Sequence, residues 1–187
     1  MNIDRLIQAR IPDIYSIYGG ARGRTMSSRH QLYAWPALVE SGVRTVIDLR
    51  AADRSDRLPV LCEEYGMRYF HYPVDNAQET ISSMVALFPE FCSIIDEGDF
   101  YVACAMGLHR TDTALHAYWM FHGADNGIPQ PELHGYLQEK RLTTDKMMRI
   151  LNAFYKLSVE RNSYFAISPE VFKERKQAIL SAWRNNQ

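Results

Sequence analysis

At positions 101–111 the chain reads Tyr-Val-Ala-Cys-Ala-Met-Gly-Leu-His-Arg-Thr, and this stretch decides how the rest is interpreted. It overlaps a short apolar run, residues 100–105, which has the length of a buried strand. Residues 111–122 are apolar nearly all round, as in a helix packed at the centre of a domain. The stretch therefore predicts a strand that ends near Cys104, a five-residue loop, and a helix that begins near Arg110.

The predicted loop is suited to bind an anion. Its N–H groups can converge on one point, and the helix that follows presents unpaired amides and the positive end of its dipole to the same point. These dipoles and Arg110 together stabilise the thiolate form of Cys104. Arginine suits this position because its planar fork binds two phosphate oxygens at once. Thr111 is placed to donate its hydroxyl to the sulfur.

The spacing of a cysteine, five residues and an arginine is not specific by itself, because Cys62 and Arg68 have it too. There the loop would carry two glutamates beside a bound phosphate, and Cys62 lies inside a helix predicted over residues 56–65. A tyrosine follows Arg68, where Thr111 follows Arg110. We therefore interpret Cys62 as a chance match and Cys104 as the functional cysteine.

The composition is that of a globular protein. The chain has 187 residues, 47% hydrophobic and 23% charged, which fits a single domain over residues 1–187 with a C-terminal helical extension over about 163–187. Three cysteines argue against a disulfide framework and for a reducing, cytoplasmic location. We find no apolar window of membrane-spanning length and no signal peptide. A net charge of −1 gives no reason to expect a nucleic-acid partner, and the oligomeric state is open.

Strands and helices are expected to alternate along the chain. Strands are predicted over residues 14–18, 43–49, 67–74 and 100–105, and helices over 31–41, 56–65, 80–96, 111–122, 131–140, 144–162 and 169–183. An arginine-rich loop is expected after residue 20, with Arg22, Arg24 and Arg29. This alternation predicts an α/β fold with a central, mostly parallel sheet of four to five strands flanked by helices.

The sequence resembles the protein tyrosine phosphatase superfamily, in particular its compact dual-specificity and atypical bacterial members. The resemblance covers roughly residues 14–155. It is carried by residues 18–22, 43–50, 71–75 and 104–111. It implies a four-stranded parallel sheet and the hydrolysis of phosphate monoesters in two steps, without a metal or cofactor. Cys104 would form the phosphocysteine intermediate and Arg110 would bind the phosphate.

Two positions differ from the family pattern. The family usually has histidine immediately before the nucleophile, and this chain has Ala103. The residue after Arg-Thr is commonly glycine, and this chain has Asp112. The absent histidine favours a slower enzyme, and an acidic residue near a phosphate dianion is expected to be neutral or slightly unfavourable. Neither change removes a reacting group.

Asp75 is the expected general acid, which protonates the leaving oxygen and later activates water. It follows a predicted strand, close to where the family carries its acid. The alternative is that Asp75 is a turn aspartate with a purely local role. Asp48 lies within an apolar strand and is expected to form a buried pair with Arg50. His71 could replace Asp75 as the acid, but a histidine on a strand is more often structural.

The loop itself bears on the substrate. Its residues are expected to contact the phosphate: Ala105, Met106, Gly107, Leu108 and His109. Because the loop lacks the lysines common in inositol-phosphate phosphatases, the sequence favours phosphotyrosine or dual-specificity phosphoprotein substrates, or a simple phosphomonoester. The arginine-rich loop leaves open a second phosphate site, with a solvated loop as the simpler interpretation.

Three other interpretations remain open. One is a catalytically weak, phosphate-binding pseudophosphatase. The second is an inositol-phosphate phosphatase, and the third is a rhodanese-type sulfur-transfer domain, against which the Gly-x-x-Arg-Thr ending of the loop weighs. His116 and His122 lie six positions apart, on different faces of the predicted helix, so they do not suggest a metal site.

Overall fold

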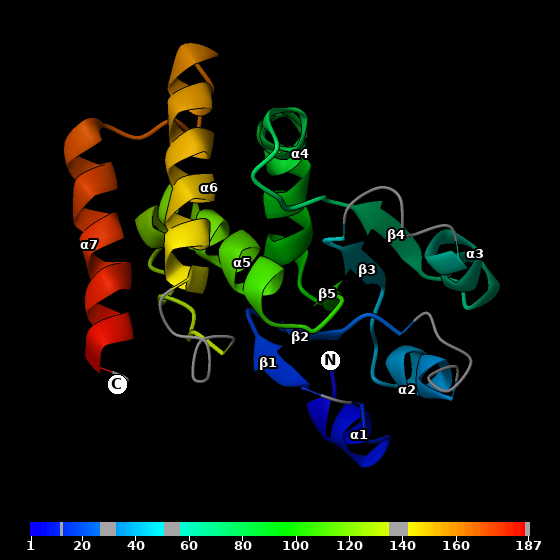
Figure 1. The fold of residues 1–187 in the computed structure, drawn as a ribbon. Helices are drawn as coiled ribbons and strands as arrows, with labels where there is room; N and C mark the ends of the chain where they lie inside the picture. Colours follow the sequence, from blue (N-terminus) through cyan, green and yellow to red (C-terminus); the bar gives the residue numbers. More distant parts are fainter. Residues whose placement is uncertain (12, 27–32, 51–56, 135–141, 186–187) are drawn as a thin grey trace.

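The structure, a computed structural model, describes residues 1–11, 13–26, 33–50, 57–134 and 142–185 (Figure 1). Its centre is a five-stranded sheet in the order β1-β2-β5-β3-β4. The pair β1–β2 is antiparallel, and the other three pairs are parallel. The strands are β1 (Tyr15–Ile17), β2 (Gly20–Arg24), β3 (Thr45–Asp48), β4 (Arg68–His71) and β5 (Phe100–Cys104). The predicted α/β fold with a mostly parallel sheet is confirmed.

Helices cover both faces of this sheet. They are α1 (Ile3–Gln8), α2 (Ala34–Glu40), α3 (Arg57–Glu64), α4 (Gln78–Glu97), α5 (His109–Phe121), α6 (Leu142–Glu160) and α7 (Pro169–Asn185), with a 3-10 turn η3 (Gly123–Asn126). Alternate residues of β5 show the division: Val102 faces the core shared with α4–α7, and Ala103 faces the core shared with α1–α3. In Figure 1, α2 and α3 accordingly lie across the sheet from α6 and α7.

The C-terminal helices extend the larger core. The Tyr155 ring of α6 stacks on Phe172 of α7 with their centroids 4.1 Å apart. Arg175 Nη1 donates to the Met120 carbonyl oxygen over 2.5 Å, which joins α7 to the end of α5. Ile179 is fully buried. We propose that the C-terminal helical extension, described over residues 163–185, folds with the rest of the chain as one domain.

One expected segment is wrong, and another lies mostly outside the described residues. Residues 20–24 form β2 rather than a loop; Gly20 weakens the strand signal in the sequence, yet its lack of a side chain is required here. A Cβ at Gly20 would lie 2.6 Å from the Phe100 ring. The helix expected over 131–140 is absent from residues 131–134, and residues 135–140 lie outside the described part of the chain.

Candidate active site

The site forms where β5 ends and α5 begins. Cys104 is the last residue of β5, the intervening residues 105–108 form the anion loop, and His109 opens α5. Gly107 has a φ of 68°, and a Cβ there would lie 2.5 Å from the Gly23 carbonyl carbon. The anion loop therefore packs directly on the backbone of β2 and requires glycine at this position.

Cys104 lies within reach of the helix start. The Thr111 hydroxyl donates a hydrogen bond to Cys104 Sγ over 3.3 Å. The first backbone hydrogen bond of the helix runs from the Asp112 N–H to the Leu108 carbonyl oxygen over 2.8 Å. Amides at the start of a helix have no acceptor within the helix, so this end of α5 can bind an anion beside the sulfur.

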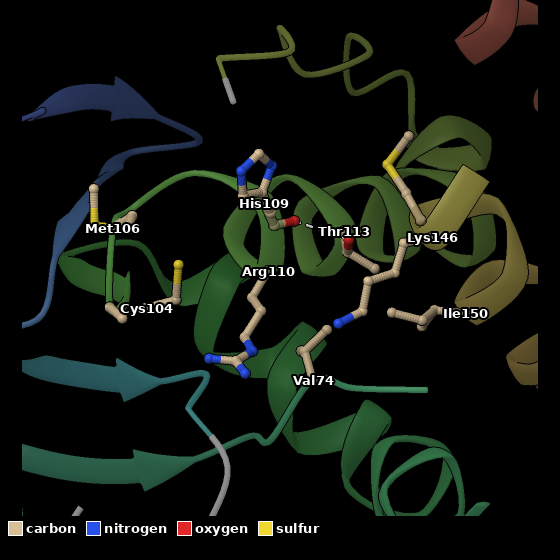
Figure 2. A pocket seen from close by; sticks show the side chains of 10 residues that line it. Val74, Cys104, Met106, His109, Arg110, Thr113, Lys146 and Ile150 are labelled. Carbon is tan, nitrogen blue, oxygen red and sulfur yellow. Dashed lines mark hydrogen bonds between the residues drawn. The ribbon is translucent and has the colours of Figure 1, made fainter. Parts of the chain in front are cut away.

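A cavity of about 300 Å³ opens over Cys104. Figure 2 shows the Arg110 guanidinium and the Lys146 ammonium directed to the same side of it, whereas the His109 ring points the other way. The lining residues come from the anion loop and α5, from the chain after β4, and from α6: Val74, Cys104, Ala105, Met106, His109, Arg110, Thr113, Lys146, Met147 and Ile150. Gly107 and Leu108, which were also expected to contact the phosphate, are not among the lining residues.

Asp75 lies beside this cavity and is held by two cations. Its Oδ2 is 3.5 Å from Arg110 Nη2, and its Oδ1 is 3.4 Å from Lys146 Nζ. Partial burial acts to raise the pKa of Asp75, but the Asn76 N–H, Lys146 and Arg110 outweigh it and lower the pKa below its ordinary value. Asp75 is therefore a carboxylate at neutral pH when no phosphate is bound.

Lys146 lines the cavity, although the sequence did not predict it as a site residue. No motif surrounds this residue, and its helix shows only the spacing of an ordinary amphipathic segment. Its position at the site follows from the way α6 packs beside α4 and α5, which brings the first turns of α6 to the end of β5. Lys146 adds a cation that the anion loop itself lacks.

Arg22 and Arg24, which were expected in an arginine-rich loop, lie in β2 and pair with carboxylates. Arg22 is 1% exposed, and its Nη1 lies 2.5 Å from Oδ1 of the fully buried Asp112. Arg24 pairs with Asp13, with Nε 2.5 Å from Oδ2. Arg29 lies outside the described residues. The interpretation of Arg22 and Arg24 as parts of a solvated loop or a second phosphate site is therefore wrong. Asp112 is also not expected to repel a phosphate dianion, because Arg22 neutralises the charge of Asp112.

The residues interpreted as structural make contacts of their own outside the anion loop. The Arg50 guanidinium donates to Asp48 over 2.9 Å and 3.0 Å, and the Arg50 N–H donates to it over 3.1 Å. His71 Nε2 lies 2.8 Å from the Arg50 carbonyl oxygen, and His71 is not among the residues that line the cavity. Cys62 is fully buried, and burial, with a smaller contribution from Asp48, raises the pKa of its thiol to about 12. Such a thiol is protonated and unreactive at neutral pH.

Among the described residues, no group of three or more histidine, cysteine, aspartate or glutamate side chains is arranged to hold a metal ion. His116 Nδ1 instead contacts the Asp112 carbonyl oxygen at 2.7 Å, and His122 Nε2 contacts Asp96 at 2.8 Å. None of the described helices has the length and hydrophobicity that a membrane crossing requires.

Residues 22–150 match the family PTP-NADK, described as the DSP-PTPase phosphatase fused to NAD+ kinase. The chain belongs to this family. It is therefore a phosphatase of the protein tyrosine phosphatase-like superfamily, and the resemblance inferred from the sequence is confirmed. The matched residues run from Arg22 in β2 to Ile150 in α6, so they include the whole cavity described above.

Solved structures share the fold. A DUF442 protein from Shewanella putrefaciens CN-32, described as a phosphatase, superposes with a TM-score of 0.58 at 18% identity over 85% of this chain and 98% of its own. A second structure of it gives a TM-score of 0.57 at 17% identity, over 84% and 98%. At this identity the likeness concerns the fold alone. No curated protein matches the chain.

Proposed function

We propose that this phosphatase hydrolyses phosphate monoesters through a phosphocysteine at Cys104. The observation that carries the proposal is the convergence of four groups at the end of β5. Cys104 supplies the sulfur, Thr111 bonds it, Arg110 lines the same cavity, and Asp75 lies 3.5 Å from Arg110. Three cysteines without a disulfide fit a reducing compartment, for which we propose the cytoplasm.

In the first step, the Cys104 thiolate attacks the phosphorus, an S–P bond forms, and the bond to the leaving oxygen breaks. Arg110 and the anion-loop amides hold the phosphoryl oxygens. Asp75 gives its proton to the leaving oxygen. This proton is available because a bound dianion engages Arg110 and places negative charge near Asp75, which opposes the cations that keep the carboxyl ionised in the empty site.

In the second step, the Asp75 carboxylate takes a proton from water as the water oxygen attacks the phosphorus. The S–P bond breaks, and the electron pair returns to Cys104 as a thiolate. The Thr111 hydroxyl stabilises that thiolate by its hydrogen bond, which makes sulfur a better leaving group. The products are the alcohol from the first step and inorganic phosphate, and the enzyme recovers its starting protonation.

The cavity wall favours an apolar group next to the phosphate. Val74, Met106 and Ile150 line it, while Lys146 adds one cation beyond Arg110. We propose phosphotyrosine or dual-specificity phosphoprotein substrates, since an aromatic ring fits between such side chains. The family's description pairs this phosphatase with NAD+ kinase, and the phosphoryl group that a kinase transfers to NAD+ forms a phosphate monoester. A substrate panel therefore includes phosphopeptides, inositol phosphates and NADP+.

The intermediate can be trapped directly. Acid-quenching the enzyme during turnover of an aryl phosphate, with a chelator present, is expected to leave one phosphoryl group on the peptide that contains Cys104, measured by mass spectrometry. Turnover with the trapped phosphoryl group on another residue would contradict the proposal. Phosphate binding without turnover would favour the pseudophosphatase interpretation, and thiosulfate sulfur transfer would favour the rhodanese interpretation.

Replacing Lys146 by methionine is expected to move the alkaline limb of the kcat/KM profile to higher pH. Lys146 lowers the pKa of Asp75, so its removal raises that pKa, and the acid form of Asp75 then persists to higher pH. Lys146→Arg is expected to keep the parent profile. Lys156→Met, an exposed position on the same helix, serves as the matched control. An unchanged limb in Lys146→Met would show that Lys146 does not act on the general acid.

A further inference from the structure

A buried ion pair lies beneath the anion loop. Arg22 comes from β2 and Asp112 from the first turn of α5, and both are almost completely shielded from water. A charge buried alone costs a large amount of free energy, so each of these residues requires the other. The pair is neutral as a unit, and it therefore does not act on the substrate through net charge.

Arg22 also holds the anion loop from behind. Its Nη2 donates to the Gly107 carbonyl oxygen over 3.0 Å and contacts the Leu108 carbonyl oxygen at 3.4 Å. In a planar trans peptide the C=O and the next N–H point in opposite directions, and the described chain has no cis peptide. The N–H groups of Leu108 and His109 therefore point away from Arg22.

We propose that Arg22 is a positioning residue of the phosphatase site, which aims the Leu108 and His109 amides at the bound phosphate. The inference rests on the proposed function, because it takes the anion loop as the phosphate site. Asp112 supports this role, because it neutralises the charge of Arg22 and holds its guanidinium against α5. The amides then meet the phosphate already oriented, and no free energy is spent on reorganising the loop.

The surroundings explain why the loop needs this support. Gly107 adopts a positive φ, which a free chain samples only part of the time, so the loop conformation must be held. On the other side of the sheet, Ala103 contributes only a methyl group to an apolar cluster. The residue before Cys104 thus offers the loop no hydrogen bond from its side chain, whereas Arg22 bonds two of its carbonyls.

The test replaces the pair in a way that preserves folding. Arg22→Met combined with Asp112→Leu removes both charges, and apolar replacement of a buried pair is often neutral for stability. Arg22→Lys keeps the charge beside Asp112 but loses the fork that reaches two carbonyl oxygens. The matched control is Arg175→Met, since Arg175 also bonds a carbonyl of α5 and pairs with a carboxylate, Asp125, at the far end of that helix.

The measurements are the Kd for inorganic phosphate by titration calorimetry, kcat and KM for an aryl phosphate, and the melting temperature. The double variant is expected to melt near the parent and to bind phosphate at least about tenfold more weakly, with lower kcat and higher KM. Arg175→Met is expected to show the reverse: a lower melting temperature with parental phosphate binding. A lower melting temperature with parental phosphate binding in the double variant would show that the Arg22–Asp112 pair is merely structural.

A phosphate Kd within about twofold of the parent in the folded double variant would overturn the proposal. If the double variant fails to fold, Arg22→Lys tests the positioning role instead. It is expected to bind phosphate more weakly than the parent, and parental phosphate binding in Arg22→Lys would overturn the proposal. Phosphate binding needs no turnover, so this test is separate from that of the phosphocysteine. If the unmodified protein binds phosphate but does not hydrolyse monoesters, the proposed function is wrong. The effect of Arg22 on phosphate binding can still be measured in that case.

Discussion

Cys104→Ser is expected to reduce phosphatase activity to background, a loss of at least about 10⁴-fold in kcat. A serine hydroxyl is a far weaker nucleophile than a thiolate and needs a base to activate it. Arg110 and Lys146 are cations, the His109 ring points the other way, and Asp75 is required in its protonated form in the first step. The measurement is steady-state hydrolysis of an aryl phosphate with a chelator present.

Cys62→Ala is the matched control for this loss. Cys62 has the same spacing to an arginine, but it is buried in α3 on the other side of the sheet, and its thiol is protonated at neutral pH. Its removal is expected to leave kcat unchanged. Cys104→Ser should still bind inorganic phosphate, because Arg110 and the anion loop are retained. Hydrolysis that survives in Cys104→Ser would refute the phosphocysteine mechanism.

Asp75→Asn is expected to lower kcat by about 10²–10⁴-fold, the range for loss of a general acid. The amide cannot donate a proton to the leaving oxygen, so the loss should be larger for alkyl phosphates than for aryl phosphates with a good leaving group. The alkaline limb of the kcat/KM profile that reports Asp75 should also disappear. Rates for a series of leaving groups and a pH profile measure both effects.

Asp4→Asn, which changes an exposed carboxylate on α1, is the control and should match the parent. An equal rate loss for good and poor leaving groups in Asp75→Asn would assign Asp75 to the binding of Arg110 rather than to proton transfer. Parental kcat in that variant would support the alternative of a turn aspartate and direct the search for the acid elsewhere.

Features that are local to one segment could be predicted from the sequence alone. The loop between Cys104 and Arg110, the hydrogen bond from Thr111 and the exclusion of Cys62 all depend on residues within one strand, loop and helix. Short-range spacing and the start of a helix determine such features, so the pattern of residue types is sufficient to predict them. The apolar runs around β3 and β5 likewise predicted the parallel sheet and its helices.

Contacts between groups that are distant in the sequence became known from the folded structure. Arg22 looked like part of a solvated loop, and Asp112 like an unfavourable charge, until the pairing of β2 with β5 placed them together. Lys146 reaches Asp75 only because α6 packs beside the end of the sheet. Strand order and helix packing result from burial of the whole core, and no window of sequence around these residues contains that information.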